Sequence, residues 1–304
     1  MPQRPNAPSS PPTPVSLPPL PDAVIEPIVR LALAEDLGAA GDVTTDALID
    51  PATTGRWELV ARRPGVVAGL DAMVMTARLA TGGISIRLRL DDGMRVEAGG
   101  VIATIDGCAR AVLTAERVML NFVGQLSGVA TLTRAYVDAV AGTQAQIACT
   151  RKTTPGLRAL EKRAVRLGGG LPHRYGLFDA ILIKDNHIAA AGGVAPAMTR
   201  AKAAAGHLMP IEIEVDSLAQ LEEALRFSPD VILLDNFKLD DLRAAVKRVD
   251  GAVPLEASGG VSLETVRAIA DTGVNIISVG ALTHSAPALD VALDVALDVA
   301  LDTK

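Results

Sequence analysis

Cysteine, aromatic side chains and long apolar runs are all scarce in this chain of 304 residues. Its two cysteines, Cys108 and Cys149, have neither a CxxC partner nor a histidine at metal-ligand spacing, which argues against a disulfide framework and a structural zinc site. Aromatic residues make up 2% of the chain, so the core must be built from Ala, Val, Leu and Ile. We expect both cysteines to be reduced, which makes the cytoplasm the default compartment. No run of about 18 uninterrupted apolar residues exists, so we expect no transmembrane helix.

An excess of positive charge is missing too, since the formal net charge is −6 and the sequence pI is about 5.3. Proteins that bind nucleic acid or acidic membranes need a positive field to attract phosphate groups. We therefore expect neither a nucleic-acid nor a membrane partner, and any anion site must be a local basic pocket. The length allows one large domain, or a large domain plus a smaller one.

The sequence patterns divide the chain into four segments. Proline-rich residues 1–22 predict an extended, unpacked tail. Mixed helical and alternating patterns over residues 23–142 predict a smaller α/β domain whose end can rejoin the C-terminal helix. Residues 143–287 alternate short apolar runs with Ala-rich helical patterns, which favours a β/α barrel, and the ALDV repeats of residues 288–304 predict a terminal helix with slanting Leu and Asp stripes.

Polar residues follow each of the six apolar runs within 143–287. We take the runs to be apolar throughout and expect the functional residues at the strand ends. One such residue alone is commonly a solvated loop charge, but six in register predict a single pocket, because the strand ends of a β/α barrel converge at its C-terminal mouth. The six sites are Thr150-Arg151-Lys152, Lys184-Asp185-Asn186, Glu214, Asp235-Asn236, Ser258-Gly259-Gly260 and Gly280.

The residue types in this pocket indicate the ligand. Arg151, Lys152 and Lys184, with His173 and Arg174 from a glycine-rich loop, predict a ligand with several negative charges, because guanidinium groups fit carboxylates or phosphates in bidentate fashion. His187, in the string KDNH, suits loop orientation as well as chemistry.

Two carboxylates and the glycine turns complete the predicted site. Glu214 and Asp235 can hold Mg²⁺, usually through water, or accept hydrogen bonds from sugar hydroxyls. The Ser258–Gly260 turn and Gly280 offer backbone N–H groups to a phosphate. Together they predict a magnesium-bound phosphosugar beside a second anion. No Ser/His/Asp arrangement, dinucleotide fingerprint or P-loop supports another reading.

Several strings resemble the quinolinate phosphoribosyltransferase family, also called nicotinate-nucleotide pyrophosphorylase (carboxylating). The likeness covers roughly residues 23–294 and is most specific in the block from TRKTTPGLR to HRYGL. The strings are EDLGAAGDVTTDAL, AERVMLNFVGQLSGVAT, TRKTTPGLRALEKRAVRLGGGLPHRYGL, ILIKDNHI, EIEVDSL, ILLDNF, EASGGV and ISVGALTHSAPALD.

The resemblance implies an N-terminal open α/β sandwich domain followed by a C-terminal incomplete β/α barrel. It also implies a homodimer or a higher even oligomer, in which Arg117 crosses to the neighbouring subunit's site. Lys152, Lys184, Glu214 and Asp235 would be catalytic, the last two also holding Mg²⁺. The implied substrate-binding residues are Arg117, Thr150, Arg151, Lys152, His173, Arg174, Lys184, Glu214, Asp235, Ser258, Gly259, Gly260, Val279, Gly280 and Ala281.

The implied reaction transfers the phosphoribosyl group of phosphoribosyl pyrophosphate to quinolinate, with decarboxylation, in de novo NAD biosynthesis. Three alternatives stay open. A related transferase of the same fold could act on another anionic ring, such as nicotinate. A β/α-barrel lyase could use Lys184 as a Schiff-base nucleophile, and the chain could also be a metabolite-binding module without catalysis.

Overall fold

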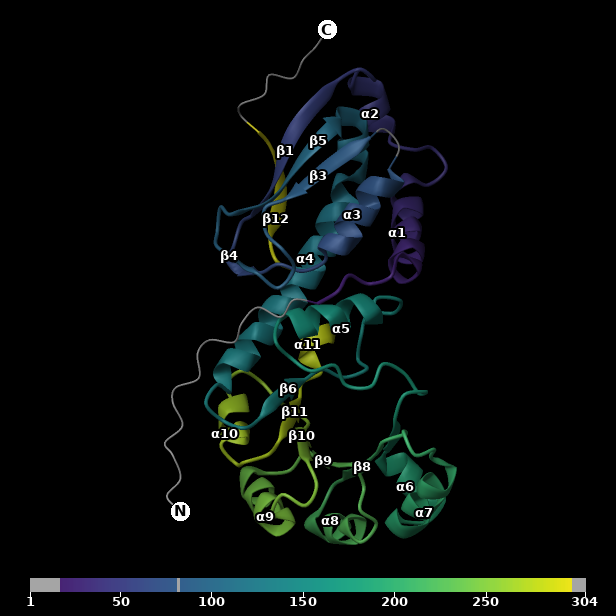
Figure 1. The fold of residues 1–304 in the computed structure, drawn as a ribbon, viewed down its shortest axis with the longest axis vertical. Helices are drawn as coiled ribbons and strands as arrows, with labels where there is room; N and C mark the ends of the chain where they lie inside the picture. The colour runs from purple at the N-terminus through teal and green to yellow at the C-terminus, as the bar shows by residue number, and fades with distance from the viewer. Residues whose placement is uncertain (1–16, 81–82, 297–304) are drawn as a thin grey trace. The chain divides into compact units, whose positions relative to one another are not determined.

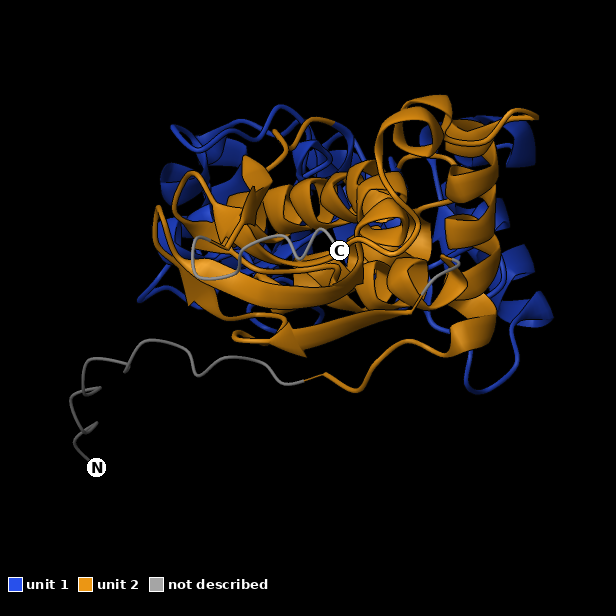
Figure 2. Ribbon diagram, turned by 90° about the horizontal axis from the view of Figure 1, so that it is seen from above, with its two compact units in different colours: residues 1–12, 135–153, 170–284 blue, residues 13–134, 154–169, 285–304 orange. Residues whose placement is uncertain are grey.

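A computed structural model describes residues 17–80 and 83–296, which form two compact units (Figures 1 and 2). Among the described residues, the first unit, here the barrel unit, holds 135–153 and 170–284. The second, here the sandwich unit, holds the others, namely 17–134, 154–169 and 285–296. The expected boundary at 142/143 therefore differs from the observed one, because the 31-residue helix α4 (Ala109–Ala139) runs past residue 134 and residues 154–169 return to the sandwich unit.

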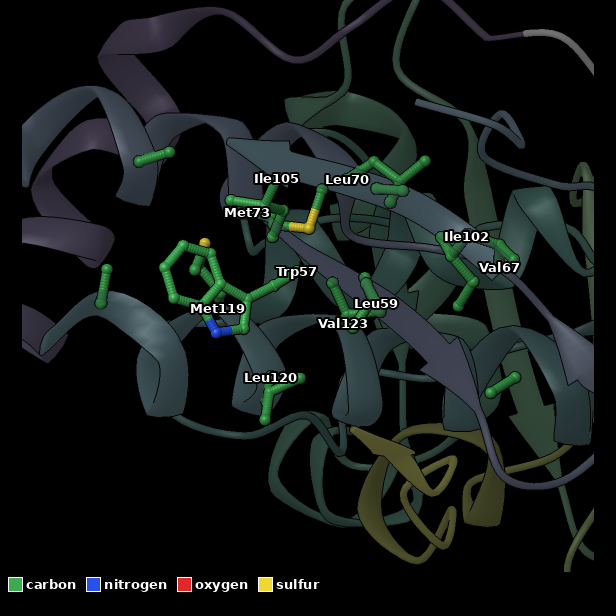
Figure 3. Packing of buried hydrophobic residues seen from close by; sticks show 14 of the residues in the cluster. Trp57, Leu59, Val67, Leu70, Met73, Ile102, Ile105, Met119, Leu120 and Val123 are labelled. Atoms are coloured by element: carbon green, nitrogen blue, oxygen red, sulfur yellow. The ribbon is translucent and has the colours of Figure 1, made fainter. Parts of the chain in front are cut away.

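The sandwich unit is built on an antiparallel four-stranded sheet of order β12-β1-β5-β3. Its core buries the single tryptophan, Trp57, with Ile105, Met73 and Met119, between the sheet and helices α3 and α4 (Figure 3). The elements are α1 (Asp22–Leu37), α2 (Val43–Leu48), β1 (Thr54–Ala61), β2 (Gly65–Val66), α3 (Leu70–Leu79), β3 (Ile84–Leu88), β4 (Arg95–Val96), β5 (Val101–Cys108), α4, α5 (Arg158–Leu167) and β12 (Val291–Val295).

Strand β12 shows that the predicted terminal helix was wrong over Val291–Val295, while residues 297–304 of that prediction lie outside the described residues. A period of four is also a multiple of two, so the ALDV repeat satisfies the alternation of a strand. Val291 and Leu293 pack against the core, whereas Asp294 pairs with Arg62 at 2.6 Å. Similarly, most of the predicted tail 1–22 lies outside the described residues, and α1 begins at its last residue, Asp22.

The barrel unit contains six parallel strands in the order β6-β11-β10-β9-β8-β7, which confirms the six predicted apolar runs. Within the described residues β6 and β7 do not pair, so the barrel is incomplete, and an isolated bridge between Ala148 and Leu171 lies at this gap. The strands are β6 (Gln146–Ala148), β7 (Ile181–Ile183), β8 (Ile211–Val215), β9 (Val231–Asp235), β10 (Leu255–Ser258) and β11 (Ile276–Ser278).

Short helices follow the strands of the barrel unit, as strand–helix alternation predicts. The polar residues lie near the junctions between the strands and these helices, so the fold gathers them at the carboxyl ends of the strands. No helix in the described parts of the chain is both long and apolar enough to cross a membrane. The helices are α6 (Asp185–Ala191), α7 (Val194–Ala204), α8 (Leu218–Leu225), α9 (Leu239–Val249), α10 (Val266–Ala270) and α11 (Ala281–His284).

Candidate active site

The polar residues at the ends of the six barrel strands line one cavity of about 780 Å³. A cavity of this size accommodates a small-molecule ligand together with its bound water. The predicted residues among its lining are Thr150, Arg151, Lys152, His173, Arg174, Lys184, Glu214, Asp235, Ser258, Gly259, Gly260, Gly280 and Ala281.

Arg151 and Arg174 line the same part of the cavity, here called the basic wall, and their positive charges repel each other. Burial, with the charge of Arg151 added to it, lowers the pKa of Arg174. Arg174 donates one guanidinium N–H to the Ala180 carbonyl at 3.0 Å. Within the described chain, the buried Nε atoms of Arg151 and Arg174 have no hydrogen-bond partner. Buried donors without partners are costly, so this wall is built to receive an anion.

Lys184 follows the end of β7, and its Nζ donates to the Glu214 carboxylate at 3.0 Å. The Lys184 side chain remains about half exposed, so it can reach a ligand in the cavity. The imidazole Nδ1 of His187 accepts the backbone N–H of Lys184 at 2.9 Å. Of the two readings left open for His187, this contact favours orientation of the loop.

Asp235 and Asn236 follow β9 and are joined by a hydrogen bond of 2.7 Å from the Asn236 amide to Asp235 Oδ2. Asn236 has a positive φ of 55° and donates its backbone N–H to the Ser258 carbonyl at 2.9 Å. Asn236 also lines the cavity, although it was not among the predicted site residues. Its signal in the sequence is its type, because asparagine tolerates the left-handed conformation that a tight strand-end turn requires.

Glycine is required at one turn around the cavity, and at another there is little space for a side chain. Gly259 has a φ of 97°, and a Cβ there would collide with the Asn236 side chain. A Cβ on Gly280 would lie 3.2 Å from the side chains of Lys152 and His284. Val279 is buried, and its N–H already donates to the Ala148 carbonyl at 2.9 Å, so of the predicted residues Val279–Ala281 only Gly280 and Ala281 line the cavity.

His173 is positioned differently from the other predicted site residues. Its Nε2 lies 3.0 Å from Glu212 and 3.8 Å from Glu256, two buried glutamates inside the barrel. The strand-end pattern missed both, because it treated the runs of β8 and β10 as apolar throughout. Their signal was a period of two, which places Glu212 on the same side of its strand as Glu214, and Glu256 on the same side as Ser258.

Arg117 lies in helix α4 of the sandwich unit and is exposed. It contributes to a different hollow, of about 410 Å³, with residues of α4 and of the segment 288–291. It is therefore not among the residues that line the cavity of the barrel unit.

An incomplete β/α barrel with a cationic wall, two carboxylates and glycine turns at its mouth defines a site for small phosphorylated and carboxylated ligands. The comparisons with known proteins agree with this class. Residues 42–127 match the family model described as "Quinolinate phosphoribosyl transferase, N-terminal domain", and residues 129–294 match the corresponding C-terminal domain model.

Similar proteins cover nearly the whole chain. A nicotinate-nucleotide pyrophosphorylase [carboxylating] of Mycobacterium leprae is 49% identical, over 86% of this chain and 94% of that protein. A probable nicotinate-nucleotide pyrophosphorylase [carboxylating] of Bacillus subtilis is 44% identical, over 85% and 89%. A solved structure of the nicotinate-nucleotide pyrophosphorylase from Francisella tularensis has a TM-score of 0.87 at 39% identity, covering 91% and 98%. The chain belongs to the quinolinate phosphoribosyltransferase family.

Proposed function

We propose that this protein transfers the phosphoribosyl group of phosphoribosyl pyrophosphate to quinolinate and releases pyrophosphate and CO₂, giving nicotinate mononucleotide for de novo NAD biosynthesis. The observation that carries the proposal is the basic wall of Arg151 and Arg174, whose buried Nε atoms have no partner in the described chain. Two adjacent ring carboxylates account for such a concentration of guanidinium groups better than one does. The family relationship supports the same reaction.

The residues of the cavity suit a reaction in which the pyridine nitrogen attacks the anomeric carbon of the ribose. That nitrogen already has a lone pair, so no side chain has to act as a strong general base. Arg151, Lys152 and Arg174 would bind the ring carboxylates and hold the nitrogen toward the ribose, a contribution of position rather than of bond chemistry. Lys184, which is half exposed, would lie between the two substrates and stabilise negative charge on the departing pyrophosphate.

The opposite wall suits the phosphosugar. Glu214 and Asp235 would accept hydrogen bonds from the ribose hydroxyls, and the turns at Ser258–Gly260 and Gly280 would bind the 5-phosphate through backbone N–H groups. The oxygen donors of Glu214 and Asp235 fit Mg²⁺, which would neutralise charge on the pyrophosphate when bound. We infer the cytoplasm as the compartment of the reaction.

We further propose that the protein acts as a homodimer or a higher even oligomer, in which Arg117 reaches the neighbouring subunit's cavity. Support comes from the exposure of Arg117 and from its absence among the lining of its own chain's cavity in the described residues. An additional guanidinium group would complete the basic wall.

The decisive experiment is mass spectrometry of the product formed from quinolinate, phosphoribosyl pyrophosphate and Mg²⁺. We expect nicotinate mononucleotide and one CO₂ per turnover. Turnover of nicotinate but not quinolinate would instead indicate a nicotinate-specific transferase. Tight binding of both substrates without any product would indicate a binding module, and trapping of a carbonyl substrate on Lys184 by borohydride would indicate a Schiff-base lyase.

A further inference from the structure

An acidic cluster adjoins the cavity, which His173 and Glu256 line. One ligand-type atom each of His173, Glu212 and Glu256 lies within 4.8 Å of the others. Both glutamates are more than nine-tenths buried, and in the described chain one carboxylate oxygen of each has no hydrogen-bond partner. A second cavity, of about 190 Å³, is also lined by His173 and both glutamates. Two buried carboxylates are costly to a fold, and the proposed reaction assigns no role to either.

The contacts of His173 fix its tautomer. Its Nδ1 accepts the backbone N–H of Arg174 at 2.8 Å, so this nitrogen carries no proton. Nε2 is then the ring nitrogen that carries a proton, and it lies 3.0 Å from the Glu212 carboxylate, which can accept that proton in a hydrogen bond. Both ring nitrogens thus lie against protein groups.

The ionisation of Glu256 depends on its burial and on its acidic neighbour. Burial, with the charge of Glu212 added to it, raises the pKa of Glu256 to about 7. Glu256 therefore keeps its proton in mildly acidic solution and loses it as the pH rises through 7. Glu212 and Arg151 both act on the charge of Arg174.

The cluster is connected to the basic wall through the segment Leu171–Ala180, which occupies the gap between β6 and β7. Leu171 joins this segment to β6, donating to the Ile147 carbonyl at 2.7 Å and accepting from the Cys149 N–H at 3.0 Å. At the other end of the segment, the Arg174 side chain donates a hydrogen bond to the Ala180 carbonyl. Between these two attachments, the ring of His173 contacts the Arg174 backbone N–H on one side and the Glu212 carboxylate on the other.

We propose that Glu212 and Glu256 are positioning residues: they hold the Nε2–H of His173 inside the barrel and thereby place Arg174 against the substrate carboxylate. The inference rests on the proposed function for the identity of that substrate. It adds a second role, exerted through Arg174, to the carboxylate-binding role that the family resemblance implied for His173.

The first test compares Glu212→Gln and Glu256→Gln with Glu222→Gln, a surface glutamate of the same unit that pairs with Arg248. Loss of the charged acceptor for His173 in Glu212→Gln should raise the KM for quinolinate by roughly tenfold or more. The KM for phosphoribosyl pyrophosphate should change less, because Glu214, which shares strand β8 with Glu212, is held by Lys184 and not by His173. The Glu222→Gln control should leave both constants unchanged.

The pH profile separates the two glutamates. Above about pH 7 the ionised Glu256 would repel Glu212 and loosen the cluster, so kcat/KM for quinolinate should fall as the pH rises. Both Glu256→Gln and Glu256→Ala should remove this decline, because neither side chain ionises. Glu256→Ala, which leaves a cavity, should in addition lower kcat/KM at every pH. If Glu212→Gln changed both KM values equally, or if Glu256→Gln kept the decline, the positioning role would be wrong.

A second measurement does not depend on the reaction. The chain has four histidines, so ¹⁵N NMR of histidine-labelled protein can assign His173 with the variants His187→Asn, His207→Gln and His284→Gln. We expect the Nε2–H tautomer with an unprotonated Nδ1 from pH 6 to 8. A protonated Nδ1, or a stoichiometric metal ion that Glu256→Gln releases, would overturn the proposal. Absence of nicotinate mononucleotide with the expected tautomer would reject the proposed function alone.

Discussion

Among the glycines that line the cavity, Gly259 leaves the least room for a Cβ. Its φ of 97° is one that residues with a Cβ rarely adopt, and a Cβ would also strike the Asn236 side chain. Gly260 has a φ of 61° but nothing within 4 Å of its Cβ position. Both positions therefore have a backbone conformation that would strain a residue with a Cβ. Only at Gly259 would that Cβ also collide with a neighbour.

This pair gives the first prediction. Gly259→Ala should displace Asn236, and with it the carboxylate of Asp235, and raise the KM for phosphoribosyl pyrophosphate by about tenfold or more. Gly260→Ala introduces strain alone and should have a smaller effect. Steady-state kinetics of both variants measures the difference, and equal effects would show that strain, rather than contact with Asn236, decides.

Lys184 is the second residue whose role can be tested directly. Its half-exposed side chain contributes little to the packed core, so Lys184→Ala should fold normally. Loss of its charge next to the departing pyrophosphate should lower kcat by about 10²-fold or more. The thermal unfolding midpoint serves as the control. A variant with normal kcat would place Lys184 outside the chemical step.

The raised pKa of Glu256 also predicts how stability depends on pH. A carboxyl whose folded pKa is about 7, above its usual 4.5, contributes no penalty below pH 4.5 and an increasing one as the pH rises toward and through 7. The loss for this buried group is of the order of 3 kcal/mol. Wild-type protein should therefore lose more of its unfolding midpoint between pH 5 and 8.5 than Glu256→Gln does. Parallel curves for the two proteins would contradict the assigned ionisation.

At the scale of helices and strands, the barrel strands could be predicted because a parallel strand that is covered on both faces reads as a short apolar run. The C-terminal ALDV repeat could not, because a four-residue period suits a drifting helix and an alternating strand equally well. Pairing of β12 with β1, more than 200 positions away in the sequence, decides between them. The same limit explains Glu212 and Glu256, whose burial depends on neighbours supplied by other strands.

Strand β12 can be tested by its two faces. Leu293 lies opposite Leu59 and packs against the core of the sandwich unit, so Leu293→Ala should lower the free energy of unfolding by about 1–2 kcal/mol. Asp294 forms an exposed ion pair with Arg62, and Asp294→Ala should cost less than about 1 kcal/mol. Thermal or urea unfolding measures both. A larger loss in Asp294→Ala would indicate that the segment does not pair in this register.

At the scale of the whole molecule, the proposed composite site makes activity depend on two chains. Arg117→Ala and Lys184→Ala should each be inactive as homodimers. In a heterodimer of the two, the chain with intact Lys184 receives Arg117 from its partner, so one site of two is complete.

Random reassociation of equal amounts makes half of the dimers mixed, so the mixture should recover about a quarter of wild-type activity. Lys184→Ala mixed with Glu214→Ala is the matched control, because both lesions lie in the same cavity and no intact site can form. Subunit exchange is verified by native mass spectrometry of chains with different tags. If exchange occurs and the first mixture stays as inactive as the control, Arg117 acts within its own chain or not at all.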